Sequence, residues 1–122
     1  LIKDKDEILL ECDKEQIARV FFNLIKNSIE SIEQKAEKNS SFSKKILIEI
    51  LSNNDHIKII LIDNGIGFNQ KNNIQEILNP YFTTKKNGTG LGLSIVNKII
   101  NDHNGELNFF STSDGVKVEI NF

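Results

Sequence analysis

The chain has 122 residues, of which 39% are hydrophobic and 26% charged, and its formal net charge is -2. This length gives one domain with a single hydrophobic core, and the lack of a basic block argues against a nucleic-acid partner. No apolar stretch approaches the ~20 residues of a membrane span, so no membrane contact is expected. Because the sequence begins at Leu1, residues 1–122 are expected to be one domain of a longer protein.

The first part of the chain predicts a short strand followed by a long helix. Residues 8–12 form an apolar run typical of a strand, which would include the single cysteine, Cys12. Asp13 offers a helix N-cap, with Gln16 at the reciprocal position of a capping box. From residue 14 to about residue 37, hydrophobic residues recur at helical spacing along one face.

The rest of the chain predicts two β-hairpins separated by a long loop and a second helix. Residues 68–87 are polar and irregular, and a loop of this length in a compact domain is usually a lid or a binding loop. Antiparallel strand pairs with helices gathered elsewhere indicate an α+β two-layer sandwich, in which helices cover one face of a mixed, mostly antiparallel sheet. The expected strands are 46–51, 57–62, 106–111 and 116–122, and the expected helix is 92–102.

Two asparagines of the long helix are the first candidate site residues. Asn23 and Asn27 are one helical turn apart, so they share a face, and they stand among hydrophobic residues. Buried amides need hydrogen-bond partners. The pair could therefore tie the helix to a strand end, or it could offer oxygen ligands to Mg²⁺, a hard cation that often binds substrate phosphates as well.

A second candidate segment, Asp63 to Gly67, follows the predicted strand 57–62. Asp63 would stand at the mouth of an apolar strand, where a carboxylate can accept a hydrogen bond from an exocyclic amine. Gly65 and Gly67 would let a flat ring approach the backbone. The same residue types also favour an ordinary tight turn, so this segment has two interpretations.

The alternating glycines Gly88, Gly90 and Gly92 immediately precede the second predicted helix. A glycine loop that leads into a helix N-terminus presents backbone N–H groups to an anion, most often a phosphate; the other interpretation is a flexible loop. Upstream, Lys85 belongs to a lysine pair that follows a proline, two aromatic residues and two threonines. Such a lysine could reach a triphosphate as a point charge, or it could be solvated.

In this order, the segments resemble the conserved boxes of one family. Asn23 to Glu30 resembles the N box, Asp63 to Gly67 the G1 box, Pro80 to Lys85 the F box and Gly88 to Leu93 the G2 box. These boxes belong to the ATP-binding catalytic domains of two-component sensor histidine kinases, in the gyrase, chaperone, histidine kinase and mismatch-repair ATPase superfamily. The sequence is most similar to the nitrogen-regulation type. The resemblance implies a Bergerat-type fold with a long ATP lid.

The resemblance also implies a role for each position. Asp63 would bind the adenine amino group, with Gly65 and Gly67 lining the base. Asn27 would ligate Mg²⁺, with Asn23 beside it in the triphosphate pocket. Residues 68–88 would form the lid. The other implied contacts to ATP are Thr84, Lys85, Gly88, Thr89, Gly90, Leu91, Gly92 and Leu93.

The implied activity is transfer of the γ-phosphoryl group of ATP to a histidine on a separate dimerisation and phosphoacceptor domain. Neither His56 nor His103 lies in a phosphoacceptor context, and His103 is expected to help end its helix. A response regulator would be an indirect partner, and the domain would be the cytoplasmic part of a membrane-anchored bacterial sensor kinase. The alternatives are an anti-sigma-type serine kinase of the same fold and a catalytically silent nucleotide-binding or docking module.

The sequence departs from the family pattern at three places. Asn23 stands where hydrolytic relatives carry a glutamate that activates water, which fits phosphate transfer to a protein better than hydrolysis. Glu30 stands where many histidine kinases carry a lysine. On the last strand, residues 116–118 are Val-Lys-Val, where the family usually has a hydroxyl residue near the adenine.

Overall fold

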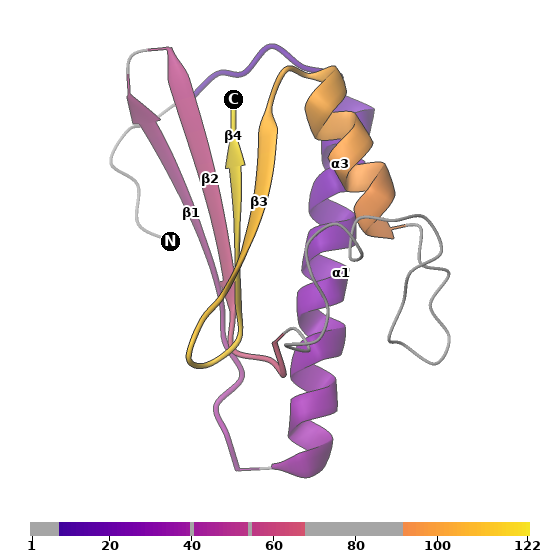
Figure 1. Cartoon of the computed structure of the whole chain (residues 1–122), viewed down its shortest axis with the longest axis vertical. Helices are drawn as coiled ribbons and strands as arrows, with labels where there is room; N and C mark the ends of the chain where they lie inside the picture. The colour runs from indigo at the N-terminus through magenta and orange to yellow at the C-terminus, as the bar shows by residue number, and fades with distance from the viewer. Residues whose placement is uncertain (1–7, 40, 54, 68–91) are drawn as a thin grey trace.

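The computed structural model describes residues 8–39, 41–53, 55–67 and 92–122. Two helices lie together on one face of a four-stranded sheet, so the predicted α+β two-layer sandwich is confirmed (Figure 1). The elements are α1 (Lys14–Lys38), β1 (Ile46–Asn53), β2 (His56–Asp63), α3 (Gly92–Asp102), β3 (Glu106–Ser111) and β4 (Val116–Asn121).

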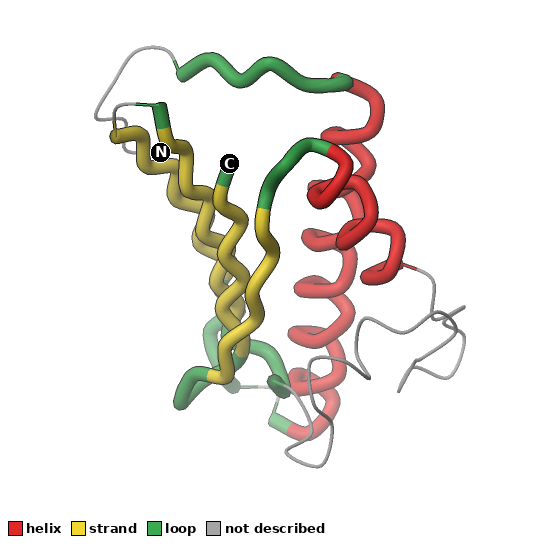
Figure 2. Tube along the Cα trace, turned by 45° about the horizontal axis from the view of Figure 1, so that its top comes forward, coloured by secondary structure: helices red, strands yellow, loops and turns green. Residues whose placement is uncertain are grey.

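The sheet has the strand order β1-β2-β4-β3, and all three strand pairings are antiparallel. Figure 2 shows the four strands as one twisted layer beside the helices. Side chains of a strand alternate between the two faces of its sheet. Ile59, Leu61 and Asp63 are therefore on the face of β2 that packs toward the helices, and all three are buried. The carboxylate of Asp63 thus ends an otherwise apolar inward row.

The helix α1 begins as the sequence predicts. The Asp13 side chain accepts hydrogen bonds from the backbone N–H groups of Glu15 (3.0 Å) and Gln16 (3.1 Å), which satisfies two donors that the helix itself leaves unpaired. The buried residues of α1 are one turn apart along a single stripe, namely Val20, Leu24, Ser28 and Ile32. Three are hydrophobic and one is a serine, so α1 also brings a hydroxyl into the protein interior.

The hydrophobic core lies between this stripe, α3 and the inward face of the sheet. The helix α3 spans the predicted residues and packs against both α1 and β3. Residues recurring at helical spacing on α3 and at alternate positions on the strands meet in one cluster. Its buried members are Val20, Leu24, Ile59, Leu61, Val96, Ile99, Ile100, Leu107, Phe109, Val116, Val118 and Ile120.

Residues 8–12 do not form the predicted strand. They run as an irregular segment that leads into α1 (Figure 1), and Cys12 is half-buried within it. An apolar run becomes a strand only when a neighbouring edge pairs with its backbone, and no described strand pairs with this one. The segment is instead joined to the end of α3, since the Asp13 N–H donates to His103 Nε2 at 3.1 Å.

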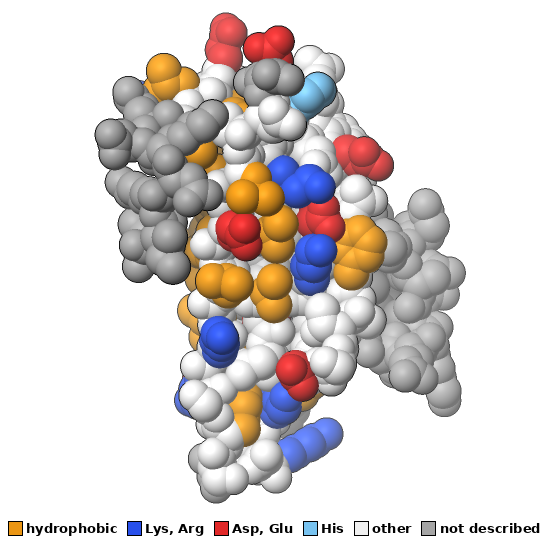
Figure 3. All heavy atoms as spheres, turned by 90° about the vertical axis from the view of Figure 1, so that its left-hand side faces the viewer, with side chains coloured by type: hydrophobic (Ala, Val, Ile, Leu, Met, Phe, Trp, Pro, Cys, Tyr) orange, Lys and Arg blue, Asp and Glu red, His pale blue; other side chains and the backbone are white. Residues whose placement is uncertain are grey.

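The opposite face of the sheet carries hydrophobic side chains interspersed with charged ones (Figure 3). Leu47, Leu51 and Phe110 are exposed there. Glu119 of β4 bridges Lys58 at 3.3 Å and Lys117 at 3.0 Å. The hydrogen bond from Lys117, together with Lys58, holds the pKa of Glu119 below its ordinary value, against the opposing effect of desolvation. Of the predicted site residues within the described ranges, none lies on this face.

Candidate functional site

Asp63 is the buried centre of the candidate site. Its side chain is at the inward end of β2, and the residue is only 5% exposed. Oδ1 accepts a hydrogen bond from the Gly65 N–H at 2.9 Å, and Oδ2 accepts one from the Ser28 hydroxyl of α1 at 3.0 Å. A buried carboxylate is costly unless such donors compensate for lost water. The two bonds fix the carboxylate between α1 and the loop that follows β2.

This loop is packed closely against two other segments. A Cβ atom at Gly65 would overlap the Ser31 side chain of α1, and one at Gly115 would overlap the carbonyl oxygen of Asp63. The Ser31 hydroxyl also accepts a hydrogen bond from the Ile66 N–H at 3.0 Å. Gly67 has a φ of 76°, a conformation that favours glycine. The close approach at Gly65 is therefore made by the protein's own helix, which the sequence interpretation did not foresee.

Lys35 of α1 ties the same loop to the β3–β4 turn. Its Nζ donates to the carbonyl oxygens of Asn64 (3.0 Å) and Asp114 (3.3 Å) and lies 5.1 Å from the centre of the Phe42 ring. The Asn64 side chain in turn accepts from the Lys45 N–H at 2.9 Å and donates to the backbone before β1. Hydrogen bonds from α1 and from the segment before β1 therefore hold the loop beside Asp63.

Asn23 and Asn27 are half-buried rather than buried. The Nδ2 of Asn23 donates to the Arg19 carbonyl oxygen of its own helix at 3.0 Å, so the amide does not tie α1 to a strand end. Its Oδ1 faces the start of α3, 3.5 Å from the place where Gly92 would carry a Cβ atom. Asn23 and Gly92, two of the predicted site residues, therefore lie next to each other.

Several predicted site residues lie outside the described part of the chain, as does the predicted lid, residues 68–88. Leu93, by contrast, is half-buried and packs against the hydrophobic core. The predicted nucleotide contacts that lie outside the described residues are Thr84, Lys85, Gly88, Thr89, Gly90 and Leu91. Their roles stay predictions.

The structure adds Ser28, Ser31 and Lys35, three residues of α1 that the sequence interpretation missed. Ser28 could have been found, since it falls at the buried i+4 spacing set by Val20 and Leu24, where a polar residue must have an internal partner. Ser31 and Lys35 gave no comparable signal, because their partners are backbone groups distant in sequence. In the described part of the chain, every buried side-chain polar atom has a hydrogen-bond partner.

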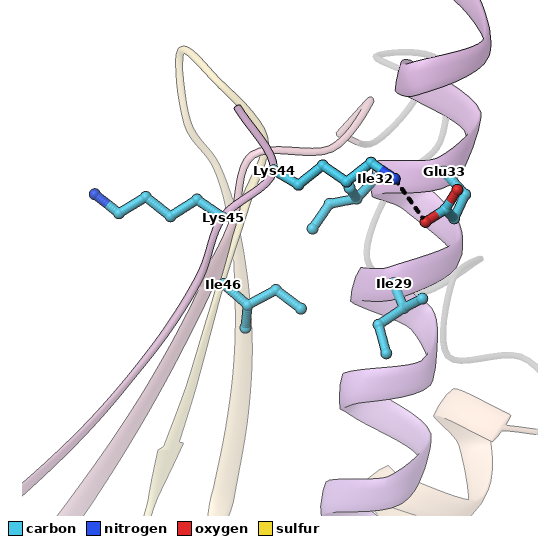
Figure 4. A pocket seen from close by; sticks show the side chains of 6 residues that line it. All are labelled: Ile29, Ile32, Glu33, Lys44, Lys45 and Ile46. Carbon is cyan, nitrogen blue, oxygen red and sulfur yellow. Dashed lines mark hydrogen bonds and ion pairs between the residues drawn. The ribbon is translucent and has the colours of Figure 1, made fainter. Parts of the chain in front are cut away.

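A separate cleft of about 260 Å³ opens between α1 and the start of β1 (Figure 4). Ile29, Ile32 and Ile46 give it an apolar lining, and the ion pair between Lys44 and Glu33 (3.1 Å) crosses it. None of the predicted site residues that the structure describes lines this cleft. It is therefore distinct from the candidate site at Asp63.

His103 ends α3 as the sequence predicts. Its Nδ1 lies 2.8 Å from the Ile99 carbonyl oxygen, one of the last carbonyls of the helix. Because its Nε2 accepts the Asp13 N–H, Nδ1 is the protonated nitrogen that donates to Ile99. His103 thereby joins α3 to the segment that enters α1.

Residues 12–122 match the family described as histidine kinase-, DNA gyrase B-, and HSP90-like ATPases. Sensor protein TdiS of Thauera aromatica is 38% identical over 101 residues, which are 83% of this chain and 18% of that protein. An NtrY-like sensor histidine kinase of Rickettsia felis is 36% identical over 118 residues, or 96% of this chain and 18% of the relative. Sporulation kinase E of Bacillus subtilis is 38% identical and matches 79% of this chain.

This chain spans less than a fifth of the length of these relatives. Within the described residues, neither helix is both long and apolar enough to cross a bilayer. Among solved structures, the nucleotide-free catalytic domain of histidine kinase ThkA superposes with a TM-score of 0.79 at 29% identity, covering 98% of this chain and 73% of that one. The mycobacterial sensor histidine kinase MprB, at 18% identity and a TM-score of 0.73, shares the fold. The chain therefore belongs to the histidine kinase-, DNA gyrase B-, and HSP90-like ATPases, as its motifs predict, and has the fold of a histidine kinase catalytic domain.

Proposed function

We propose that this chain is the catalytic domain of a sensor histidine kinase, which binds ATP with Mg²⁺ and donates the γ-phosphoryl group to a histidine on a separate dimerisation and phosphoacceptor domain. The observation that carries the proposal is the buried carboxylate of Asp63, held by Ser28 and Gly65 at the end of β2. In a family of ATPases, such an acceptor at the mouth of an apolar strand suits the amino group of adenine.

Asp63 supplies the base recognition in this proposal. An ionised carboxylate accepts hydrogen bonds and donates none, so it favours a base with an exocyclic amine over one with a carbonyl at the same position. Two donors already orient its oxygens, and each oxygen retains acceptor capacity for the amine. The backbone of the adjoining loop at Gly65 and Gly67 would line the base, while the space beside the missing side chain of Gly65 is occupied by Ser31.

Asn23 and Asn27 supply the phosphate end. Both are half-buried amides on one face of α1, and Asn23 Oδ1 lies beside the start of α3. Amide oxygens fit Mg²⁺, which accepts oxygen ligands and keeps several waters, and the N-terminus of α3 suits a phosphate. Asn27 would ligate the metal with Asn23 beside it. Bound Mg²⁺ would neutralise phosphate charge, and the protein's contribution is positioning.

Asn23 also bears on where the phosphoryl group goes. Its amide cannot act as a general base toward water, and its Nδ2 is already bonded to Arg19 O. Transfer to a protein side chain is therefore favoured over hydrolysis. Neither described histidine suits the acceptor role, since His103 caps α3 and His56 begins β2. The acceptor would lie elsewhere in the longer protein, a membrane-anchored sensor whose kinase part is cytoplasmic and whose phosphate passes to a response regulator.

The test is phosphorylation of the longer protein that contains this domain. Incubation with γ-labelled ATP and Mg²⁺ should give protein-bound phosphate that is labile in acid and stable in base, as expected of phosphohistidine. The Asn27→Ala variant is the matched control and should remain unlabelled. Phosphate that is stable in acid would instead indicate a serine kinase. A folded protein that binds ATP but acquires no label would be a silent nucleotide-binding module.

A further inference from the structure

Ser28 is the one polar residue in the buried stripe of α1. It is 3% exposed, and Val20, Leu24 and Ile32 occupy the other positions of that stripe. A serine inside a helix commonly turns its hydroxyl back to the carbonyl one turn earlier. Here the hydroxyl reaches out of the helix to Asp63 Oδ2 at 3.0 Å. Since a carboxylate only accepts hydrogen bonds, the serine is the donor.

The neighbouring strand offers Asp63 no such donor. Val116 of β4 is directly opposite Asp63 in the register, and Val118 is opposite Leu61. Both valines are buried on the inward face. The hydroxyl that contacts Asp63 therefore comes from the helix layer, while β4 presents hydrocarbon to this end of β2.

The two bonds to Asp63 fix different oxygens. The Gly65 N–H contacts Oδ1 from within the loop, and Ser28 contacts Oδ2 from α1. The terminal torsion of an aspartate side chain is broad when nothing constrains it. With only the Gly65 bond remaining, the carboxylate could turn about that single anchor, and Oδ2 would lose its fixed direction.

We infer that Ser28 is a positioning residue that fixes the Asp63 carboxylate for selective binding of a base with an exocyclic amine. This inference rests on the proposed function, because it assigns Asp63 to base recognition. A site built around a fixed polar contact rejects analogues that lack the matching group more strongly than a site with a mobile one. Ser28 therefore acts on selectivity for adenine without touching the nucleotide itself.

The test compares two nucleotides by calorimetry on the wild-type protein and on Ser28→Ala. One is ATP and the other is purine riboside triphosphate, which lacks the amine. The wild type should prefer ATP. In Ser28→Ala this preference should fall about five- to tenfold, the scale of one hydrogen bond, through weaker ATP binding alone. Ser28→Cys has a weak S–H donor of similar size, so its preference for ATP should lie between those of the wild type and Ser28→Ala.

Ser31→Ala is the matched control, because it removes a hydroxyl one turn along the same helix that binds the Ile66 N–H rather than the carboxylate. Loosening of the loop would lower the affinities for both nucleotides equally, so the ratio of the two affinities should stay unchanged. An unchanged ratio in Ser28→Ala, or an equal loss for both nucleotides, would overturn the inference. If the wild type bound ATP and purine riboside triphosphate equally well, the inference about Ser28 would also be overturned, but the proposal that the domain binds ATP would stand. A wild type that binds neither nucleotide would overturn the proposed function itself.

Discussion

The two ends of the candidate site are built differently. At the base end, Asp63 and Gly65 are buried, Ser28 donates to Asp63, and α1 is joined to the adjoining loop by a bond that Lys35 donates and one that Ser31 accepts. At the phosphate end, Asn23 is half-buried and its Nδ2 donates to its own helix, and a Cβ atom at Gly92 would make only an ordinary contact with Asn23 Oδ1. One end is completed by protein packing, whereas at the other the Asn23 amide oxygen faces the start of α3.

Because of this difference, substitutions at the two ends should affect the stability of the fold and the binding of nucleotide to different extents. Residues at the base end contribute to both, because the contacts that would orient a nucleotide also hold the loop, the helix and the β3–β4 turn together. Residues at the phosphate end should contribute to binding with little effect on the fold. Substitutions in the two regions therefore test the comparison directly.

The largest expected effect is the difference in stability between two glycine-to-alanine substitutions, one at each end of the site. Gly65→Ala places a Cβ atom against Ser31 of α1, including its backbone, so it should lower the free energy of unfolding by about 2–3 kcal/mol, as overpacking does. Gly92→Ala meets Asn23 Oδ1 only at 3.5 Å and lies in a helix, where alanine is favoured over glycine. Its stability should be unchanged or slightly higher, while ATP binding should weaken. Thermal and urea unfolding measure the first effect.

Equal destabilisation by the two substitutions would remove the distinction between the regions. A Gly92→Ala protein with normal stability and normal ATP affinity would keep the packing difference but contradict a close phosphate approach at Gly92.

An intermediate effect is expected from Lys35. Lys35→Met keeps much of the side-chain length but removes the bonds to the Asn64 and Asp114 carbonyl oxygens. Stability should fall by about 1–2 kcal/mol, the range for one or two hydrogen bonds, and ATP affinity should fall with it because the loop beside Asp63 loosens. Lys38→Met, at an exposed position near the same helix end, is the matched control and should be close to wild type. If Lys35→Met changed neither stability nor ATP affinity, the loop would be held in place without this contact.

The smallest effect is expected on the sheet face away from both regions. Lys117 and Lys58 hold the pKa of Glu119 below its ordinary value of 4.5. A depressed carboxyl pKa contributes stability above the ordinary pKa and loses it as the pH falls through the native one. Glu119→Gln should thus be slightly less stable than wild type at neutral pH, and the gap should close in acid. Unfolding curves measured from pH 7 to below pH 4 check this, and a gap that widens in acid would contradict it.

Local sequence patterns predicted much of this fold and part of its site. The helical spacing of hydrophobic residues predicted both ends of α1 to within one residue. The apolar run before Asp63 predicted that this residue stands at the end of a strand. The prediction of a strand at residues 8–12 was wrong, because strand formation depends on a partner edge that a local pattern cannot reveal. The close approach at Gly65 was assigned to a ligand for the same reason, since Ser31 is distant in sequence.

The central claim is that Asp63 binds the base of ATP while Asn27 binds its metal, and calorimetry with and without Mg²⁺ tests it most directly. The wild type should bind ATP more tightly with Mg²⁺. Asp63→Asn should lose ATP affinity in both conditions, because an amide can turn a donor toward the amine. Asn27→Ala should lose only the gain from Mg²⁺. Wild-type affinity in Asp63→Asn, or an undiminished Mg²⁺ effect in a folded Asn27→Ala, would contradict the account.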